Sequence, residues 1–274
     1  MKIGVFDSGV GGKHVAEAIH KQLPDLEIIL KEDKQHLPYG TRSIEQIHGF
    51  VKPIFREFVD EGCQVIVVAC NTVTTNLIDK LRKEFNIPMV GMEPMIKPAA
   101  AASKTGVIAV CATPRTLSSD RYKWLKREYA QGVKVIEPDC SDWAQMVEDN
   151  TVERDRIAEI INSACGQGAD QIVLGCTHYH WIEELIRKLS AGRAQVIQPE
   201  LAVIKQLKRV MTGVNSSFNY QDIGQHGNAK SKIRNPGSSA DNEPLASDAS
   251  QVAADFHLKK TAKSTTLVRP KKLD

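Results

Sequence analysis

The chain contains two similar stretches, IVVACNT at residues 66–72 and IVLGCTH at residues 172–178. Short apolar runs resemble one another by chance, so the informative part of the match is the cysteine followed by polar residues, at Cys70 and Cys176. A second pair of stretches, GVFDSG at residues 4–9 and GVIAVCAT at residues 106–113, also matches. The repeats predict two similar lobes, each of which begins with a strand and places a cysteine at the end of a later strand.

Outward from these stretches, runs rich in valine and isoleucine alternate with longer amphipathic segments. The predicted strands are residues 3–6, 27–30, 65–69, 89–90, 106–110, 133–137, 172–174 and 196–197, and the predicted helices include residues 43–61, 76–85, 117–129, 152–166 and 181–191. Strands that are apolar on both faces require helices on both sides of a parallel sheet. The sequence therefore predicts an α/β fold of two lobes, each a mainly parallel sheet flanked by helices, with the active site in the cleft between them.

The length of 274 residues suits two such lobes. We expect the first lobe at residues 1–95, completed by residues 247–274, and the second lobe at residues 96–212. Residues 213–246 are rich in Ser, Asn, Gly, Asp and Lys and contain few large apolar side chains. This composition is typical of a flexible insertion, because it buries too little apolar surface to offset the entropy of ordering.

Composition and charge limit the classes of partner. Hydrophobic residues make up 42% of the chain and charged residues 25%, as in ordinary soluble globular proteins. The formal charge of +3 gives no electrostatic reason to expect nucleic acid or a membrane as the main partner. The N-terminus lacks a secretory apolar run, and no stretch approaches the ~18 apolar residues of a membrane span. We therefore expect a cytoplasmic protein that acts on a small molecule.

The cysteines show no Cys-x-x-Cys spacing, which argues against both a zinc ribbon and a disulfide framework. Free thiols in a reducing cytoplasm are the better interpretation. There are six of them: Cys63, Cys70, Cys111, Cys140, Cys165 and Cys176.

A glycine-rich turn, DSGVGG at residues 7–12, lies between a predicted strand and a predicted helix. Its glycines allow backbone N–H groups to point into the cleft at a helix N-terminus, where carboxylates and phosphates bind. The spacing differs from the GxGxxG of dinucleotide-binding folds, so a nucleotide site is the weaker interpretation. Taken alone, Asp7 is better explained as a helix cap than as a catalytic group.

Other candidate residues also have ordinary structural explanations when each is considered alone. A buried cysteine is more often a small inert apolar side chain than a base. His178 is consistent with a hydrogen-bonded core histidine, Glu148 with a solvent-facing helix residue, and PYG at residues 38–40 with a turn. Two cysteines with the same placement favour a catalytic role over an inert one, because a helix N-terminus after each strand would raise the thiolate fraction.

Five motifs taken together resemble one family closely, the cofactor-independent aspartate/glutamate racemases. They occur in the family's order and spacing over residues 1–211, with a fainter likeness over residues 247–268. The motifs are DSGVGG at residues 7–12, PYG at 38–40, ACNT at 69–72, ATP at 112–114 with Thr116, and GCTHY at 175–179.

The resemblance implies an isomerase that interconverts L- and D-glutamate without pyridoxal phosphate, another cofactor or a metal, and that supplies D-glutamate for peptidoglycan. It implies that Cys70 takes or delivers the α-proton on the D side and that Cys176 does so on the L side. Asp7 and His178 would assist the two thiols, and Glu148 would be a functional acid. The implied substrate contacts are Asp7, Ser8, Tyr39, Gly40, Asn71, Thr72, Thr113, Thr116, Thr177 and His178. Relatives of this kind are commonly dimers, so a homodimer is possible.

The chain departs from the family pattern at several positions. Lys13 and His14 follow the glycine-rich turn where the family usually has an apolar residue, and His180 replaces the proline that usually follows the Cys-Thr-His-Tyr motif. His180 and Asp142 either alter the rim of the pocket or lie on solvated turns, and we favour the solvated turns.

Two alternative functions remain open from the sequence. One is a related racemase for aspartate or another small diacid, which would use the same thiols with different pocket contacts. The other is a catalytically silent binding protein of the same fold. The presence of both cysteines disfavours the second, because a silent protein has no physical reason to keep a thiol at each strand end.

Overall fold

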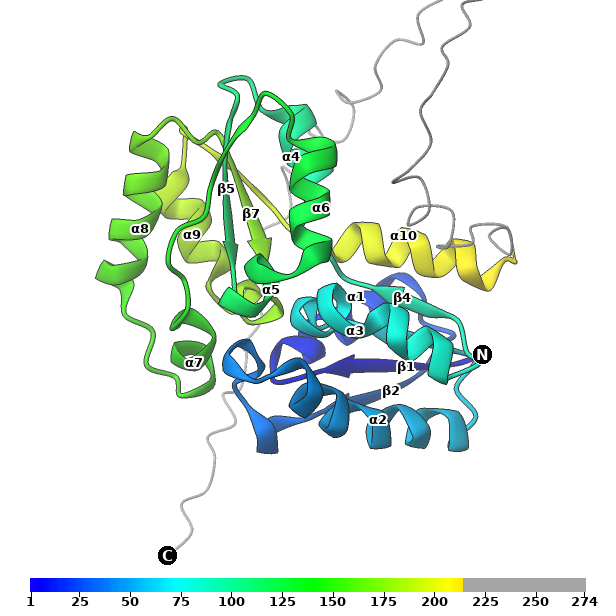
Figure 1. The fold of residues 1–274 in the computed structure, drawn as a ribbon. Helices are drawn as coiled ribbons and strands as arrows, with labels where there is room; N and C mark the ends of the chain where they lie inside the picture. Colours follow the sequence, from blue (N-terminus) through cyan, green and yellow to red (C-terminus); the bar gives the residue numbers. More distant parts are fainter. Residues whose placement is uncertain (214–274) are drawn as a thin grey trace, which may run out of the picture. The chain divides into compact units, whose positions relative to one another are not determined.

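Two parallel four-stranded sheets form the framework of the computed structural model, which describes residues 1–213 (Figure 1). The strand order is β2-β1-β3-β4 in the first sheet and β6-β5-β7-β8 in the second, and every pairing is parallel. The two-lobed parallel α/β prediction is confirmed. The strands are β1 Lys2–Asp7, β2 Glu27–Glu32, β3 Val65–Val68, β4 Met89–Gly91, β5 Val107–Ala112, β6 Lys134–Ile136, β7 Gln171–Gly175 and β8 Gln195–Ile197.

Helices cover both faces of each sheet. They are α1 Gly11–Gln22, α2 Ile44–Asp60, α3 Asn71–Glu84, α4 Ile96–Ala102, α5 Pro114–Ser118, α6 Asp120–Tyr129, α7 Trp143–Glu148, α8 Arg154–Gly166, α9 Glu183–Ser190 and α10 Glu200–Met211, with 3₁₀ turns η1 Lys34–His36, η2 Tyr39–Thr41 and η3 Thr177–Ile182. Within residues 1–213, none of these helices has the length and apolar character needed to cross a membrane.

Local sequence explains where individual helices begin. Before α2, the Ser43 side chain accepts a hydrogen bond from the Gln46 backbone N–H, and the Gln46 side chain accepts one from the Ser43 N–H, forming a capping box. Helix α3 begins at Asn71, five residues before the predicted start at residue 76. The intervening threonines are poor helix formers, but Thr74 and Thr75 donate to the backbone carbonyls of Val68 and Asn71.

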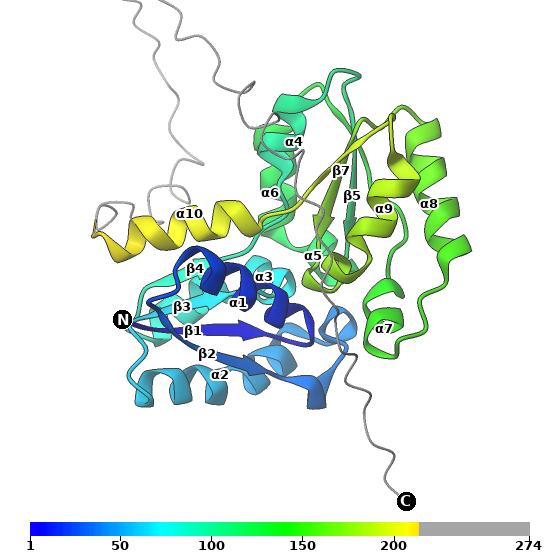
Figure 2. The ribbon, with the colours of Figure 1, turned by 180° about the vertical axis from the view of Figure 1, so that it is seen from behind.

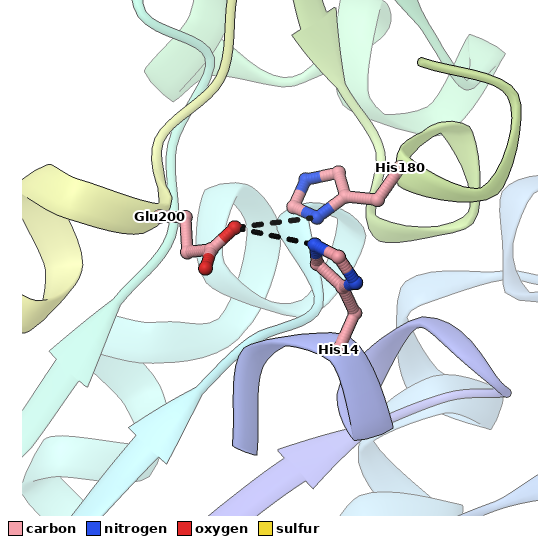
Figure 3. Close-up of side chains that lie close together, drawn as sticks. All are labelled: His14, His180 and Glu200. Carbon is pink, nitrogen blue, oxygen red and sulfur yellow. Dashed lines mark ion pairs between the residues drawn. The ribbon is translucent and has the colours of Figure 1, made fainter. Parts of the chain in front are cut away.

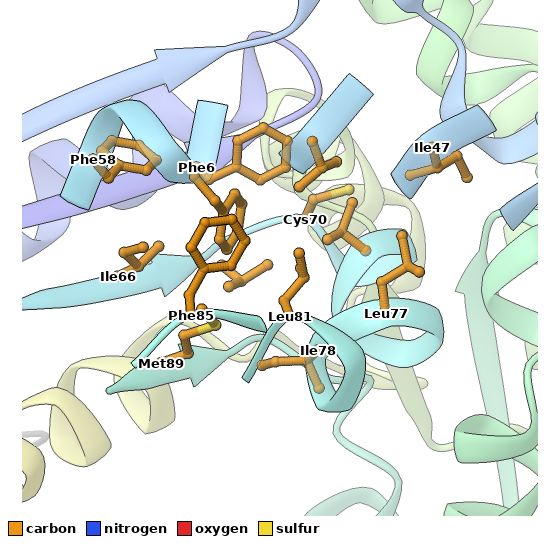
Figure 4. Close-up of a cluster of buried hydrophobic side chains, with 14 of the residues drawn as sticks. Phe6, Ile47, Phe58, Ile66, Cys70, Leu77, Ile78, Leu81, Phe85 and Met89 are labelled. Carbon is orange, nitrogen blue, oxygen red and sulfur yellow. The ribbon is translucent and has the colours of Figure 1, made fainter. Parts of the chain in front are cut away.

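Apolar side chains pack on both faces of the first sheet because successive strand residues point to opposite sides. On one face, Ile66 lies in a cluster with Phe6, Phe55, Phe58 and Phe85, part of which is drawn in Figure 4. On the other face, alternate residues of β1 and β3 pack against α1 and α10. All of β3 is buried, so its run of Val and Ile is explained by burial on both sides.

The chain passes between the two sheets twice, and this differs from the predicted division into lobes. Helix α4 packs on the second sheet, whereas Val203, Ile204 and Leu207 of α10 return to the first sheet, although residues 96–212 were predicted to form the second lobe. The crossings, at residues 91–96 and 197–200, lie side by side (Figures 1 and 2). The predicted contribution of residues 247–274 to the first lobe and the predicted insertion at residues 213–246 lie outside the described residues, except for Gly213.

Candidate active site

Cys70 and Cys176 lie at equivalent places in the two sheets. Cys70 precedes α3 just beyond β3, and Cys176 precedes η3 directly after β7, so both follow the carboxyl ends of central strands. Both thiols are free and buried. The repeated stretches of the sequence thus place two chemically equivalent groups at corresponding strand ends.

Ser8 of the glycine-rich turn contacts Cys70. The Ser8 Oγ to Cys70 Sγ distance is 3.4 Å, within hydrogen-bonding range for sulfur. Burial and then the charge of Asp7 raise the pKa of the Cys70 thiol to about 12, and the Ser8 hydrogen bond opposes this shift only in part. Cys70 is therefore a thiol at neutral pH and a strong base once it has lost its proton.

Cys176 lies at one end of a hydrogen-bonded chain of polar groups. His178 Nδ1 is 3.6 Å from Cys176 Sγ, and His178 Nε2 is 2.6 Å from Glu148 Oε1. The same carboxylate oxygen accepts the Val10 backbone N–H at 2.9 Å. Burial disfavours the charged imidazole, but hydrogen bonds with Cys176 and Glu148 outweigh it and hold the pKa of His178 well above its usual value.

Asp7 occupies a fully buried position between the glycine-rich turn and the second sheet. Its Oδ2 accepts hydrogen bonds from the backbone N–H groups of Gly12 at 2.9 Å and Gly9 at 3.2 Å, and its Oδ1 accepts one from the Thr177 hydroxyl at 3.1 Å. Burial raises the pKa of Asp7, and the nearby His178 and the backbone donors act against that shift. Asp7 therefore satisfies N–H groups at the start of α1 and links the glycine-rich turn to the loop that carries Cys176.

Polar side chains that follow the strand ends complete the site. The hydroxyl of Thr72 lies 3.1 Å from that of Thr113 and 3.4 Å from that of Thr116. The buried amide of Asn71 has no hydrogen-bond partner at either its oxygen or its nitrogen within residues 1–213. Leaving such a group unpaired costs about 1–3 kcal/mol per buried donor or acceptor, so Asn71 is available to a polar ligand.

The hydroxyl of Tyr39 is bound to a neighbouring carboxylate. The Tyr39 hydroxyl donates to Asp33 Oδ2 at 2.5 Å, and burial together with this carboxylate raises the pKa of Tyr39. Asp33 is itself buried and is paired with His36, and no motif in the sequence marks it as a site residue. Gly40 faces Thr113: a methyl group added at Gly40 would lie 3.2 Å from the Thr113 Cβ.

The expectation that His180 lies on a solvated turn is wrong. The six-residue 3₁₀ turn η3 carries the chain inward, and the His180 side chain is fully buried. Asp142 is half-buried and accepts a hydrogen bond from Arg156. A turn this short has no periodicity that would indicate its inward direction.

Replacement of Gly9 with alanine should disrupt the Cys176 side of the site while leaving the fold intact. The added Cβ would lie 2.1 Å from Glu148 Oε1 and 2.6 Å from His178 Nε2. The flexible tip of Glu148 can move away from the added methyl group, whereas the ring of buried His178 must shift, so the hydrogen bond between the two side chains is lost. We expect kcat/KM to fall roughly 10²-fold, as for a displacement of about 1 Å.

Gly49→Ala is the matched control for Gly9→Ala. Gly49 is exposed within α2, and an added methyl group meets no atom within 4 Å. It should leave kcat/KM unchanged and raise the free energy of unfolding by roughly 0.5–1 kcal/mol. A Gly9→Ala protein with normal kcat/KM would show that the close approach of Glu148 to the turn has no role in turnover.

Comparisons with known proteins agree with this arrangement. Residues 3–207 match the family Asp/Glu/Hydantoin racemase. The chain is 38% identical over 217 residues to the glutamate racemase of Herpetosiphon aurantiacus, covering 78% of this chain and 85% of the relative. It is 38% identical over 211 residues to that of Methylococcus capsulatus, covering 76% of this chain and 78% of the relative.

A similar solved structure is Escherichia coli glutamate racemase in complex with L-glutamate and the activator UDP-MurNAc-Ala. Its TM-score is 0.72 at 28% identity, with 77% of this chain and 82% of that chain covered. The family match over residues 3–207 includes both cysteines.

Proposed function

The chain belongs to the Asp/Glu/hydantoin racemase family, and from that membership we propose that it interconverts L-glutamate and D-glutamate by proton transfer between Cys70 and Cys176. The enzyme class is an amino-acid racemase, an isomerase. The glutamate substrate and the two-cysteine mechanism are our proposal, as is a role of the product D-glutamate in peptidoglycan synthesis. The observation that supports the proposal is that the glycine-rich turn lies against the surroundings of both thiols. Ser8 lies 3.4 Å from Cys70 Sγ, and the Val10 N–H donates to the Glu148 carboxylate that pairs with His178.

Inversion at a carbon atom requires a base on one face and an acid on the other. Besides burial and Asp7, the charge of Cys176 raises the pKa of Cys70, so the two thiols lie within electrostatic range of each other. Cys70 starts as a thiol, and Cys176 contacts an imidazole that can accept or return a proton. We propose that Cys176 removes the α-proton of L-glutamate and that Cys70 delivers a proton to the opposite face.

The reverse reaction uses the same two groups with exchanged roles. The pKa of about 12 makes the Cys70 thiolate a strong base, which suits an α-proton far less acidic than an ordinary thiol. Negative charge that develops on the substrate needs preorganised donors in a site from which water is excluded. Ser8, Asn71 and the threonine hydroxyls supply such donors, and the burial of both cysteines excludes water.

The substrate's two carboxylates would bind to the donors at the strand ends. The unpartnered amide of Asn71, the cluster of Thr72, Thr113 and Thr116, and the N–H groups at the start of α3 are suited to them. In this proposal Tyr39 acts through its backbone and ring, because its hydroxyl is held by Asp33.

The test follows L- and D-glutamate separately by circular dichroism in deuterium oxide, with the untagged full chain and no added pyridoxal phosphate. Each enantiomer should lose optical activity, and the α-position of the product should carry deuterium. Parallel assays with L- and D-aspartate identify the substrate. Faster turnover of aspartate would replace the glutamate assignment, and no exchange with either amino acid would contradict racemisation.

Glu148→Gln should slow turnover without unfolding the protein. The amide keeps an oxygen for the Val10 N–H but removes the negative charge beside His178. We expect kcat/KM to fall roughly 10²-fold, the lower end of what positioned acid–base groups contribute. Because the two enantiomers have equal free energies in water, kcat/KM must fall by the same factor in both directions.

An isotope effect distinguishes this role from general disruption. Slower transfer at Cys176 should increase the primary deuterium isotope effect on kcat/KM for α-deuterated L-glutamate and decrease it for the D-enantiomer. An equal change for both enantiomers would contradict the placement of Glu148 on the L side. Glu159→Gln, on an exposed face of α8, is the matched control.

A further inference from the structure

We propose that His14, His180 and Glu200 form a binding site for a divalent transition-metal ion such as Zn²⁺, separate from the two cysteines (Figure 3). The three residues come from α1, η3 and α10. They are far apart in the sequence, and each offers one ligand atom. Neither the proposed reaction nor its substrate contacts use any of them.

The distances are close to those of a coordinated ion. His14 Nε2 lies 3.5 Å from Glu200 Oε2, and His180 Nδ1 lies 4.0 Å from the same oxygen. All three ligand atoms lie within 4.8 Å of one another. Ligands bound to Zn²⁺ at about 2.0–2.2 Å in a tetrahedral arrangement are roughly 3.3–3.6 Å apart. The His14 to Glu200 separation already fits, and small side-chain rotations bring the other pairs to it.

His180 supplies an independent reason to expect a ligand. Its side chain has no exposed surface, yet neither Nδ1 nor Nε2 has a hydrogen-bond partner in the part of the chain that the structure describes. In Figure 3 its ring points toward Glu200 and His14. A buried imidazole without partners is costly, and coordination of a metal ion by Nδ1 would satisfy it.

The chemistry of the donors selects the class of ion. Two imidazole nitrogens and one carboxylate oxygen suit Zn²⁺ and neighbouring transition metals, whereas Mg²⁺ and Ca²⁺ prefer sites made of oxygen atoms. His14 is partly exposed, at 43% of its side chain, which leaves a route for an ion and a position for a water ligand. A bound ion would connect the first helix of one lobe to η3 of the other and to the start of α10.

The experiment uses the untagged full chain, stripped with EDTA and desalted, in a Cys70→Ala, Cys176→Ala background so that the active-site thiols do not compete for metal. Zn²⁺ is titrated by calorimetry. His14→Ala in the same background should weaken the affinity by at least about 100-fold, because loss of supporting groups alone costs 10–100-fold. His20→Ala, at an exposed position of the same helix, should leave the affinity unchanged.

A thermal and a spectroscopic measurement complete the test. Zn²⁺ at 100 times its Kd should raise the Tm by roughly 5–10 °C, and His14→Ala should remove this shift. In the Cys70→Ala, Cys176→Ala parent protein, bound Co²⁺ should give visible absorption bands. It should give no thiolate-to-metal charge-transfer band. His180→Ala should lose the bands as well. Equal Zn²⁺ affinity in the parent and His14→Ala proteins would overturn the proposal, and so would a charge-transfer band that shows cysteine ligation.

Discussion

Cys70→Ala and Cys176→Ala should each lower kcat for racemisation of either enantiomer by a factor on the order of 10⁴, the upper end of what a positioned acid or base contributes. In the proposed mechanism each thiol serves one face of the α-carbon, so the loss of either leaves inversion without a donor or an acceptor. Circular dichroism of L- and D-glutamate measures both directions. The structure places no other cysteine of residues 1–213 beside Ser8 or His178 to replace them.

The control for this prediction is Cys165→Ala. Cys165 is a free, half-buried cysteine on α8 that contacts the core of the second sheet. The chemical change is the same, and kcat should remain within about twofold of the parent value, since the side chain is remote from the reaction. Normal racemisation by either Cys70→Ala or Cys176→Ala, with unchanged folding by far-ultraviolet circular dichroism, would rule out the two-thiol mechanism.

Phe55→Ala should lower the free energy of unfolding by about 3–5 kcal/mol, a large part of the 5–15 kcal/mol available to a typical protein. Phe55 is completely buried, and its ring centroid lies 5.3 Å from Phe6, 6.0 Å from Phe85 and 6.2 Å from Phe58. Rigid surrounding aromatic rings collapse poorly into the space, so a cavity remains. Thermal unfolding should show a Tm lower by roughly 6–20 °C.

Phe50→Ala provides the comparison for Phe55→Ala. Phe50 is only partly buried at the edge of the same cluster, where it stacks on His36 at 3.8 Å between ring centroids. Its loss should lower the free energy of unfolding by clearly less than that of Phe55. Equal losses from the two substitutions would show that the aromatic cluster is not the main source of stability in the first lobe.

The strands were predictable because burial on both faces leaves a continuous apolar run, as in β3 and β7, and such a run needs no tertiary information. Helix α10 was assigned to the wrong lobe because its apolar face fits any sheet of this type. Only the packing of Val203 and Leu207 against the first sheet shows which one it covers. The early start of α3 was missed because tertiary burial overrides the low helix propensity of its threonines.

The part of the candidate site that lies directly after strand ends was predictable from the sequence. Cys70, Asn71, Cys176 and Thr177 follow from that rule. Asp7 is not the N-cap residue of α1, which is Val10, but its side chain accepts the Gly12 N–H at the start of that helix. The hydrogen bond of Glu148 to His178 joins α7 to a turn after β7, and no local pattern encodes it. The pairing of Tyr39 with Asp33 depends in the same way on the path of a loop. The family resemblance therefore identified Tyr39 as a site residue but did not identify Asp33 as its partner.

The two adjacent crossings of the chain between the sheets have a consequence for how the proposed substrate enters. Cys70 and Cys176 are only 4% and 7% exposed, so the strand ends must separate before an amino acid reaches them. The two crossings run side by side (Figure 2). Such a pair of covalent links permits one sheet to rotate relative to the other about the line that joins the two crossings, and it resists rotation about the perpendicular directions. For the proposed reaction we therefore expect admission of substrate and release of product to share this rotation, and its frequency would set an upper limit on turnover however fast the protons move.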